Sequence, residues 1–153
     1  AAGMLLSADN VEKLAHRLNA FAAERLTAEQ MQPHLKIDAL LRSTSISFEL
    51  LNELSRFEPF GEGNPRPVFA TRGLRVMAEP RVLKERHLKF RLIDDDRRTF
   101  EAIWWDGVEK SEGRTLNANS SIEIAYTLEA NRWNGNVSLQ LVVEDMRADN
   151  QNR

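Results

Sequence analysis

The sequence is first informative for what it lacks. It contains no cysteine, which excludes a disulfide framework and thiolate metal ligands. No apolar run approaches the roughly 18 residues that a membrane span requires, and no basic region followed by an apolar stretch opens the chain, so we expect neither a membrane span nor a secretory signal. The net charge is only −2 at pH 7, which argues against a protein that binds nucleic acid through its overall charge.

The chain also lacks an initiating methionine, because it begins Ala1-Ala2-Gly3-Met4. We expect it to be a piece of a longer protein. Its 153 residues suit one ordinary domain, or a domain of roughly 80 residues with part of another.

Charge is unevenly distributed along this nearly neutral chain. Acids are concentrated in the first third and in Asp94-Asp95-Asp96. Between positions 81 and 91 the single acid Glu85 is outnumbered by five basic residues, namely Arg81, Lys84, Arg86, Lys89 and Arg91. The sequence therefore predicts a locally basic surface.

The first third has the periodicity of helices. Apolar residues recur at three- and four-residue steps over 7–30, which predicts one long amphipathic helix with Ser7 as its N-cap. Residues 35–41 alternate loosely and indicate a short strand, and a second helix capped by Ser45 or Ser47 should run through Ser55. This αβα piece is too small for a core of its own, which favours a remnant of a larger domain.

Residues 57–69 separate this helical third from a β-rich remainder. The segment is too rich in proline and glycine for a helix or strand, yet it carries three Phe and a Val that favour burial. We expect an ordered connector packed between two folded parts, although an ordinary turn with incidental aromatics is the alternative. The predicted organisation is residues 1–56, the linker 57–69, a domain over 70–147 and a tail over 148–153.

After Pro67 the apolar period changes to two. Strands are predicted near 71–83, 87–93, 98–105, 121–130 and 136–146. Asn134-Gly135 signals a two-residue hairpin turn between the last two strands. The longest connection, about 106–120, could hold a short helix or a loop. Five short strands with a long third connection indicate an α+β chain that ends in a five-stranded OB-type β-barrel.

Such a barrel binds extended ligands across its second and third strands, between two clamping loops. If Leu88, Phe90 and Leu92 face the core, then alternate side chains of the second strand face outward as a basic row. Basic groups neutralise phosphates, and exposed aromatic rings stack on unpaired bases. The predicted single-strand-binding residues are Lys84 and Arg86 in the first loop, His87, Lys89 and Arg91 on the strand, Trp105, and Arg132 and Trp133 in the second loop.

Two other interpretations of these residues stay open. The basic row could be a solvated strand face paired with Glu85 and Glu101, and Trp133 could be a plug over the barrel end. Adjacent Trp104 and Trp105 must point to opposite faces, and we favour Trp104 in the core with Phe100 and Ala102.

No catalytic or metal-binding constellation can be proposed. Asp94-Asp95-Asp96 is followed by Arg97-Arg98, which favours a charged hairpin turn over a cation site. The three histidines, His16, His34 and His87, have no metal-ligand spacing. The run 61–64 lacks the pattern of a phosphate-binding loop. On its residues alone, the chain binds and does not catalyse, without a cofactor.

The connector Phe57–Phe69 resembles the linker of the RecJ single-strand-specific exonucleases of bacteria. Ala1-Ala2-Gly3 resembles the residues just after the Gly-Gly-His motif in the DHHA1 domain of that family. Three further segments resemble its OB domain, namely His87-Leu88-Lys89-Phe90, Asn131-Arg132-Trp133-Asn134-Gly135 and Ser138-Leu139-Gln140-Leu141.

The resemblance implies a cytoplasmic, nucleoid-associated parent enzyme that degrades single-stranded DNA from the 5′ end in recombination and repair. It implies Mn²⁺ or Mg²⁺ in a DHH domain, none of which is in this chain, and it implies single-strand-binding protein as a partner. Residues 1–56 would be the end of the DHHA1 domain, and the OB domain would hold the strand. An alternative from another class is a protein-interaction module whose basic patch receives an acidic peptide tail.

Overall fold

The computed structural model describes residues 3–111 and 116–149 of the chain. The chain divides into two compact units, Ala1–Leu35 and Lys36–Arg153. By compactness the division therefore falls at 35/36, and the connector 57–69 lies inside the second unit. The domain boundaries drawn from the sequence stay predictions. No helix among the described residues is long and apolar enough to cross a membrane.

The first unit is built around helix α1, Val11–Arg25, which follows a single 3-10 turn η1, Ala8–Asn10. The helix is shorter than predicted at both ends. Ser7 precedes the 3-10 turn without a side-chain capping bond, and Leu26 is extended. Beyond it the Thr27 and Gln30 side chains each accept the other's backbone N–H, at 3.2 and 3.0 Å respectively. This reciprocal turn replaces the last predicted helical residues.

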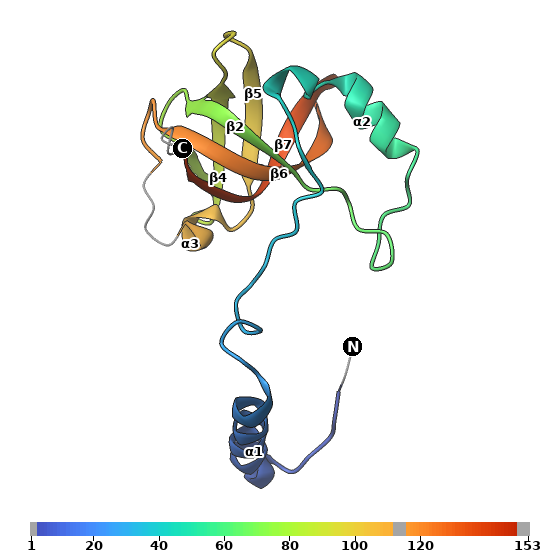
Figure 1. The fold of residues 1–153 in the computed structure, drawn as a ribbon, viewed down its shortest axis with the longest axis vertical. Helices are drawn as coiled ribbons and strands as arrows, with labels where there is room; N and C mark the ends of the chain where they lie inside the picture. The colour runs from blue at the N-terminus through green and yellow to red at the C-terminus, as the bar shows by residue number, and fades with distance from the viewer. Residues whose placement is uncertain (1–2, 112–115, 150–153) are drawn as a thin grey trace. The chain divides into compact units, whose positions relative to one another are not determined.

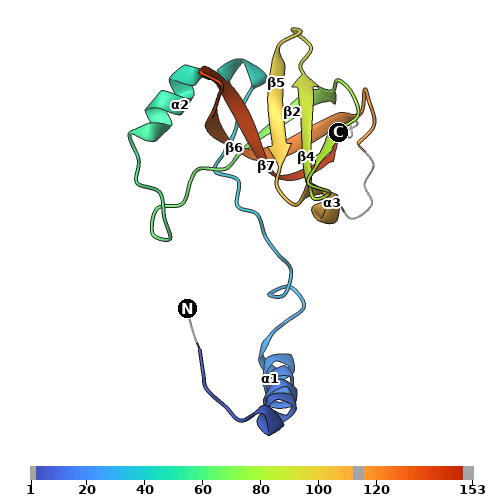
Figure 2. The same cartoon turned by 180° about the vertical axis from the view of Figure 1, so that it is seen from behind.

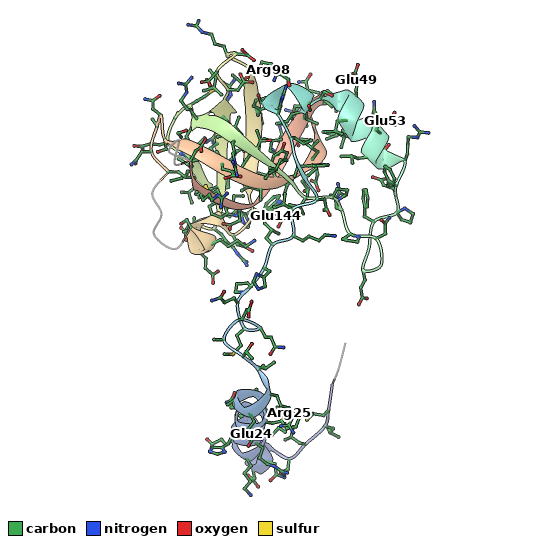
Figure 3. The ribbon with its side chains drawn as sticks, in the orientation of Figure 1. Glu24, Arg25, Glu49, Glu53, Arg98 and Glu144 are labelled. Carbon is green, nitrogen blue, oxygen red and sulfur yellow. The ribbon has the colours of Figure 1, made fainter. Side chains whose placement is uncertain are left out.

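The second unit opens with short elements: β1, Ala39–Leu40; η2, Ser43–Ser45; and α2, Phe48–Ser55. The strand predicted over 35–41 is only the two residues of β1, which pair in parallel with β2. Ser47 caps α2, since its Oγ accepts the Leu50 backbone N–H at 3.2 Å. One side of α2 packs on the core through Leu50, Leu51 and Leu54, whereas Glu49 and Glu53 are exposed (Figure 3).

The remaining strands of the second unit follow one another around a single sheet (Figures 1 and 2). They are β2, Phe69–Val76; β3, Arg81–Leu83; β4, His87–Ile93; β5, Thr99–Trp104; β6, Ser121–Trp133; and β7, Asn136–Ala148. With β1, the order is β1-β2-β6-β7-β5-β4-β3. Strand β2 pairs with β6 and also, through Arg75 and Val76, with β4. The pairings β2-β6-β7-β5-β4 thus return to β2.

The first predicted strand, 71–83, is two strands in the structure. Strand β2 ends at Val76 and β3 begins at Arg81, so six strands follow Pro67 where five were predicted, and the separately predicted β1 is the seventh strand of the sheet. Pro80 stands in the interruption, where it has no backbone N–H to give to a ladder. The chain still adjoins β4 there, because the Met77 N–H donates to the Arg91 carbonyl at 2.9 Å.

Turn chemistry of two connections follows the sequence. Asn134 and Gly135 have positive φ values of 48° and 78°, which confirms the two-residue hairpin between β6 and β7. The long third connection begins with a short helix α3, Gly107–Lys110.

Strand β2 contains an irregularity at Gly73. This glycine has a positive φ of 69°, and the β2–β6 register shifts between Thr71 and Leu74.

The core of the second unit confirms the period-two pattern. Phe90 and Leu92 are buried and Leu88 packs against the same cluster. Trp104 is fully buried while Trp105 is 47% exposed, which confirms the predicted assignment of the two tryptophans.

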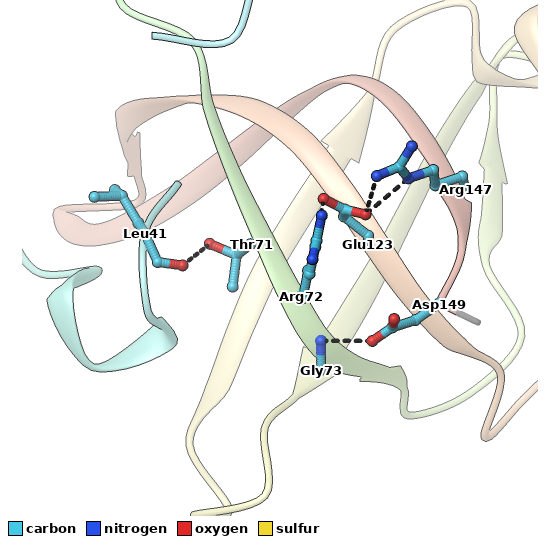
Figure 4. A network of polar contacts seen from close by, with 7 residues as sticks. All are labelled: Leu41, Thr71, Arg72, Gly73, Glu123, Arg147 and Asp149. Atoms are coloured by element: carbon cyan, nitrogen blue, oxygen red, sulfur yellow. Dashed lines mark hydrogen bonds and ion pairs between the residues drawn. The ribbon is translucent and has the colours of Figure 1, made fainter. Parts of the chain in front are cut away.

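A polar network ties β2 to its neighbours (Figure 4). Buried Glu123 on β6 accepts from Arg72 Nε at 3.1 Å and from Arg147 Nε at 2.7 Å. Thr71 donates to the Leu41 carbonyl at 3.0 Å, so its hydroxyl oxygen receives the Tyr126 hydroxyl proton across 2.8 Å. Burial raises the pKa of the Tyr126 phenol to about 12.

The connector 57–69 is ordered mainly by its own hydrogen bonds. Asn64 Nδ2 donates to the carbonyls of Phe57 and Pro59 at 2.8 and 3.1 Å. Phe69 is buried and Phe60 is half-buried, but Phe57 is 64% exposed. The prediction that all three phenylalanines are buried is therefore wrong for Phe57, since the Asn64 bonds hold the turn without that ring.

Candidate nucleic-acid interface

The outer face of strands β4, β5 and β7 carries the predicted basic row. In the register, Lys89 lies opposite Ile103, and Ile103 lies opposite Val142. Because side chains alternate along a strand, the odd residues of β4 and β5 share this outer face with the even residues 140 and 142 of β7. We call this surface the β4–β5–β7 face.

Arg81 extends the face onto β3. It lies opposite Lys89 in the β3–β4 pairing, and it is exposed. The predicted binding residues did not include Arg81. The signal was already present, since Arg81 opens the basic stretch that ends at Arg91.

An acid interrupts the basic row. Glu101 on β5 lies directly opposite Arg91, yet its Oε2 forms an ion pair with Lys89 Nζ at 3.0 Å. Arg91 instead reaches Thr99 Oγ1 at 3.5 Å and is exposed. The paired interpretation of the basic row is thus realised at Lys89, while no described residue forms a recorded ion pair with Arg91 or Arg81.

His87 and Trp105 form an aromatic pair at one end of the face. Their ring centroids are 4.8 Å apart at an interplanar angle of 79°. The Asp106 backbone N–H donates to His87 Nδ1 at 3.0 Å, so this nitrogen carries no proton and the nearby Asp106 carboxylate is not its ion-pair partner. Asp106 instead holds Arg86 in an ion pair. Trp105 therefore packs against a histidine ring that is itself held by a hydrogen bond, and it remains partly exposed to solvent.

Lys84 lies in the turn between β3 and β4. Lys84 and Glu85 both have positive φ, and the Arg86 N–H donates to the Leu83 carbonyl at 3.1 Å. This is a tight reversal that leaves the Lys84 side chain exposed.

The structure separates the other two predicted residues. Glu129 lies opposite Gln140, a residue of the β4–β5–β7 face. Trp133 is four residues further along the same strand and lies opposite Asn136, so its side chain is on the same face. Arg132 has the opposite parity and lines a groove with Phe48 and Leu51 of α2, and Glu129 borders the same groove. Adjacent residues of a strand face opposite ways, so the side chains of Arg132 and Trp133 diverge, and the role of Arg132 in single-strand binding stays a prediction.

Trp133 lies at the opposite end of the face from Trp105. It is 73% exposed, so it is not a plug over the end of the core. Val143, the partner of Trp104, lies seven positions along β7 from Asn136, the partner of Trp133. At about 3.3 Å per residue this is roughly 23 Å of strand. Two exposed tryptophans thus bracket a surface about as long as a short stretch of single strand.

A groove of about 400 Å³ lies at the β3–β4 side of this face, next to the β2–β3 connection. Its lining combines three cations with two acids and apolar side chains, and comprises Met77, Ala78, Glu79, Arg81, Lys89, Phe90, Arg91 and Glu101. It brings together Lys89 and Arg91 from the predicted set with the omitted Arg81. The arrangement suits an anionic chain that also presents hydrogen-bonding groups.

The acidic turn 94–96 is a charged hairpin turn, as predicted. Buried Asp94 accepts the backbone N–H and Nε of Arg98 at 2.8 and 3.1 Å (Arg98 is labelled in Figure 3). Burial of Asp94 opposes its ionisation, but hydrogen bonds from Arg98 and Ser43 outweigh this and hold the pKa of the carboxyl below its usual value. Asp95 pairs with Arg75 at 3.3 Å.

The described residues do not fit a catalytic metal centre. Over 3–111 and 116–149, no three His, Asp or Glu side chains converge on a point where they could hold a metal ion. We therefore derive no chemical step through a metal on this chain.

Comparison with known proteins places the site in a family context. Residues 37–145 match the family model described as the RecJ OB domain. The single-stranded-DNA-specific exonuclease RecJ of Bacillus subtilis is 29% identical over 95% of this chain and 18% of its own length. That of Thermus thermophilus is 32% identical over 71% of this chain and 14% of its own length.

Solved structures agree with these matches. The crystal structure of RecJ in complex with Mn²⁺ from Thermus thermophilus superposes with a TM-score of 0.65 and 27% identity, over 95% of this chain and 20% of that chain. The chain thus spans about a fifth of the relatives it resembles. These comparisons give no support to the acidic-peptide alternative.

Proposed function

The chain belongs to the RecJ OB domain family, and from this premise we propose that it is the single-stranded-DNA-binding module of a RecJ-like exonuclease. The observation that carries the proposal is the β4–β5–β7 face and its extension onto β3, which carry exposed Arg81 and Arg91 together with exposed Trp105 and Trp133. Cations that follow a backbone and rings that stack on bases are what single-strand binding requires. Lys84, Arg86 and His87 would border the strand near Trp105.

The returning strand pairings support an OB-type barrel as the scaffold of this face. The barrel would present strands β4 and β5 to the nucleic acid, with the β3–β4 and β6–β7 turns at its borders. We further propose that residues 1–56 are the C-terminal part of a DHHA1-like domain. The exposed apolar side chains of α1, including Val11, Leu18 and Phe21, are suited to packing against the rest of such a domain.

In the parent protein the module would hold the strand while another part cuts it. The related solved structures contain Mn²⁺ or Mg²⁺, and we propose that this metal and the 5′-to-3′ hydrolysis belong outside the present chain. The parent would act in DNA recombination and repair in the bacterial cytoplasm, near the nucleoid. A contact with single-strand-binding protein stays a prediction of the resemblance.

A titration of the 153-residue chain with a fluorescein-labelled oligothymidylate at low salt tests the proposal. We expect saturable binding that weakens steeply as salt rises, because released counterions drive phosphate contacts. A blunt duplex of the same length is the control and should bind more weakly, since its bases offer no free faces. Equal affinity for both, or no binding at low salt, would contradict the proposal.

A further inference from the structure

The groove on the β4–β5–β7 face holds an acid where a phosphate-binding surface would be expected to be purely basic. Glu101 lines the groove together with Arg81, Lys89 and Arg91. Its carboxylate is 38% exposed and lies 3.0 Å from Lys89 Nζ. A phosphate at Lys89 would therefore meet a like charge at close range.

This arrangement divides the three cations into two kinds. Arg81 and Arg91 are exposed and have no ion-pair partner recorded among the described residues, so they can neutralise phosphates. Lys89 is committed to Glu101, and the couple presents both a donor and an acceptor. Such a couple is matched to the edge of a base rather than to the backbone.

The hydrogen-bonding order of the couple selects among the bases. One carboxylate offers two acceptor oxygens, and Lys89 adds a donor beside Oε2. Guanine alone presents two adjacent donors, N1–H and the N2 amino group, followed by the acceptor O6. Cytosine, adenine and thymine can satisfy only two of the three positions. Unpaired bases expose this edge, whereas paired bases do not.

We propose that the Lys89–Glu101 couple is a guanine-reading subsite within the single-strand path. Glu101 Oε1 and Oε2 would accept from guanine N2 and N1, while Lys89 donates to O6. Met77, 38% exposed and in the same groove, would contact the face of the base with its thioether. The inference rests on the proposed single-strand binding and adds a base preference to it.

The test uses oligothymidylates of about 11 nucleotides that carry one central guanine, hypoxanthine or thymine. Hypoxanthine lacks only the N2 amino group, and a single guanine avoids four-stranded structures. With the full chain we expect the guanine strand to bind about three- to tenfold more tightly than the hypoxanthine strand. Equal affinity of the unmutated chain for the guanine and hypoxanthine strands would by itself overturn the inference. Failure of all three strands to bind would instead contradict the proposed function itself.

Two matched variants locate the effect. Glu101→Gln replaces one acceptor oxygen with a donor, so the guanine-to-hypoxanthine ratio should fall to about one while overall affinity rises through loss of a negative charge. Glu79→Gln removes the same charge from another residue of the groove and should raise affinity for all strands with the ratio unchanged. A ratio that survives Glu101→Gln, or that is lost in Glu79→Gln alone, would assign the reading to another residue and overturn the inference.

Discussion

Lys89 Nζ and Glu101 Oε2 form an ion pair across neighbouring strands at 3.0 Å, although Glu101 lies directly opposite Arg91 in the register. The diagonal pairing leaves the Arg91 guanidinium on the face, where it reaches Thr99 Oγ1 at 3.5 Å. The strongest phosphate contacts should therefore come from the arginines that flank the pair.

Removing either flanking arginine should weaken binding uniformly. We expect Arg81→Ala and Arg91→Ala each to lower affinity for all single strands and to reduce the slope of log K against log salt by about 0.7. Fluorescence anisotropy over a salt series measures both quantities. Arg132→Ala is the matched control, since Arg132 lies on the other side of the hairpin, and it should leave affinity and slope unchanged. A larger loss from Arg132→Ala would place the strand in the groove beside α2.

The two exposed tryptophans should report the strand directly. Stacking of a base on Trp105 or Trp133 quenches indole fluorescence, whereas buried Trp104 should be silent. We expect Trp105→Phe and Trp133→Phe each to remove part of the quench, and the corresponding alanine variants to cost about 1–3 kcal/mol of binding free energy per lost stack. A full quench that persists in the Trp105→Phe, Trp133→Phe double variant would contradict both assignments.

How far the sequence predicts this face can be judged residue by residue. Alternation in 87–93 correctly separated Leu88, Phe90 and Leu92 from the outward row, because one buried face imposes a strict period of two. The sequence named Glu101 as a possible partner of the basic row, but it could not show that Glu101 pairs with Lys89 while lying opposite Arg91, since that depends on the β4–β5 register. The interruption near Pro80 was not foreseen either, and the structure makes Arg81 the first residue of β3, opposite Lys89.

Arg132 shows a different limit of the sequence. Its neighbour Trp133 was correctly expected at the hairpin, but both were treated as loop residues with free orientation. Strand β6 in fact continues to Trp133, so the two side chains must diverge. The Asn134-Gly135 turn signal already implied such long flanking strands.

Tyr126 should titrate abnormally late. It is the single tyrosine of the chain, so absorbance at alkaline pH reports it alone, and we expect a midpoint near its raised pKa of about 12. Because the folded pKa lies above the ordinary value of 10.0, the stabilisation is complete below that value and is lost as pH rises toward the folded pKa. Thr71→Val should leave Tyr126 late-titrating through burial. A midpoint at the ordinary value in the folded protein would contradict the buried position.

Glu123 should make folding sensitive to acid. Burial opposes its ionisation, but hydrogen bonds from Arg147 and Arg72 hold the pKa below the usual 4.5. A lowered folded pKa gives stability that is present above 4.5 and is lost as pH falls through the folded pKa. We expect Glu123→Gln to lower the free energy of unfolding by about 1–3 kcal/mol at neutral pH, measured by urea denaturation.

The difference between wild type and Glu123→Gln should shrink in acid, because the wild-type carboxyl is then protonated as well. Glu144→Gln provides the control from β7, where Glu144 is exposed (Figure 3), and should change stability by no more than about 0.5 kcal/mol. A constant difference across the acid range would mean that Glu123 acts through its shape and not its charge.

The order of strands across the sheet has a consequence for how the protein is made. Strand β5 lies beside β7 and not beside β6, so Ile103 meets its neighbour Val142 only after 38 intervening residues have been synthesised. On the ribosome the β4–β5 hairpin can form early, but its open edge must wait for the last strand. The surface assigned to the nucleic acid is therefore completed only when β7 has been synthesised and has paired with β5.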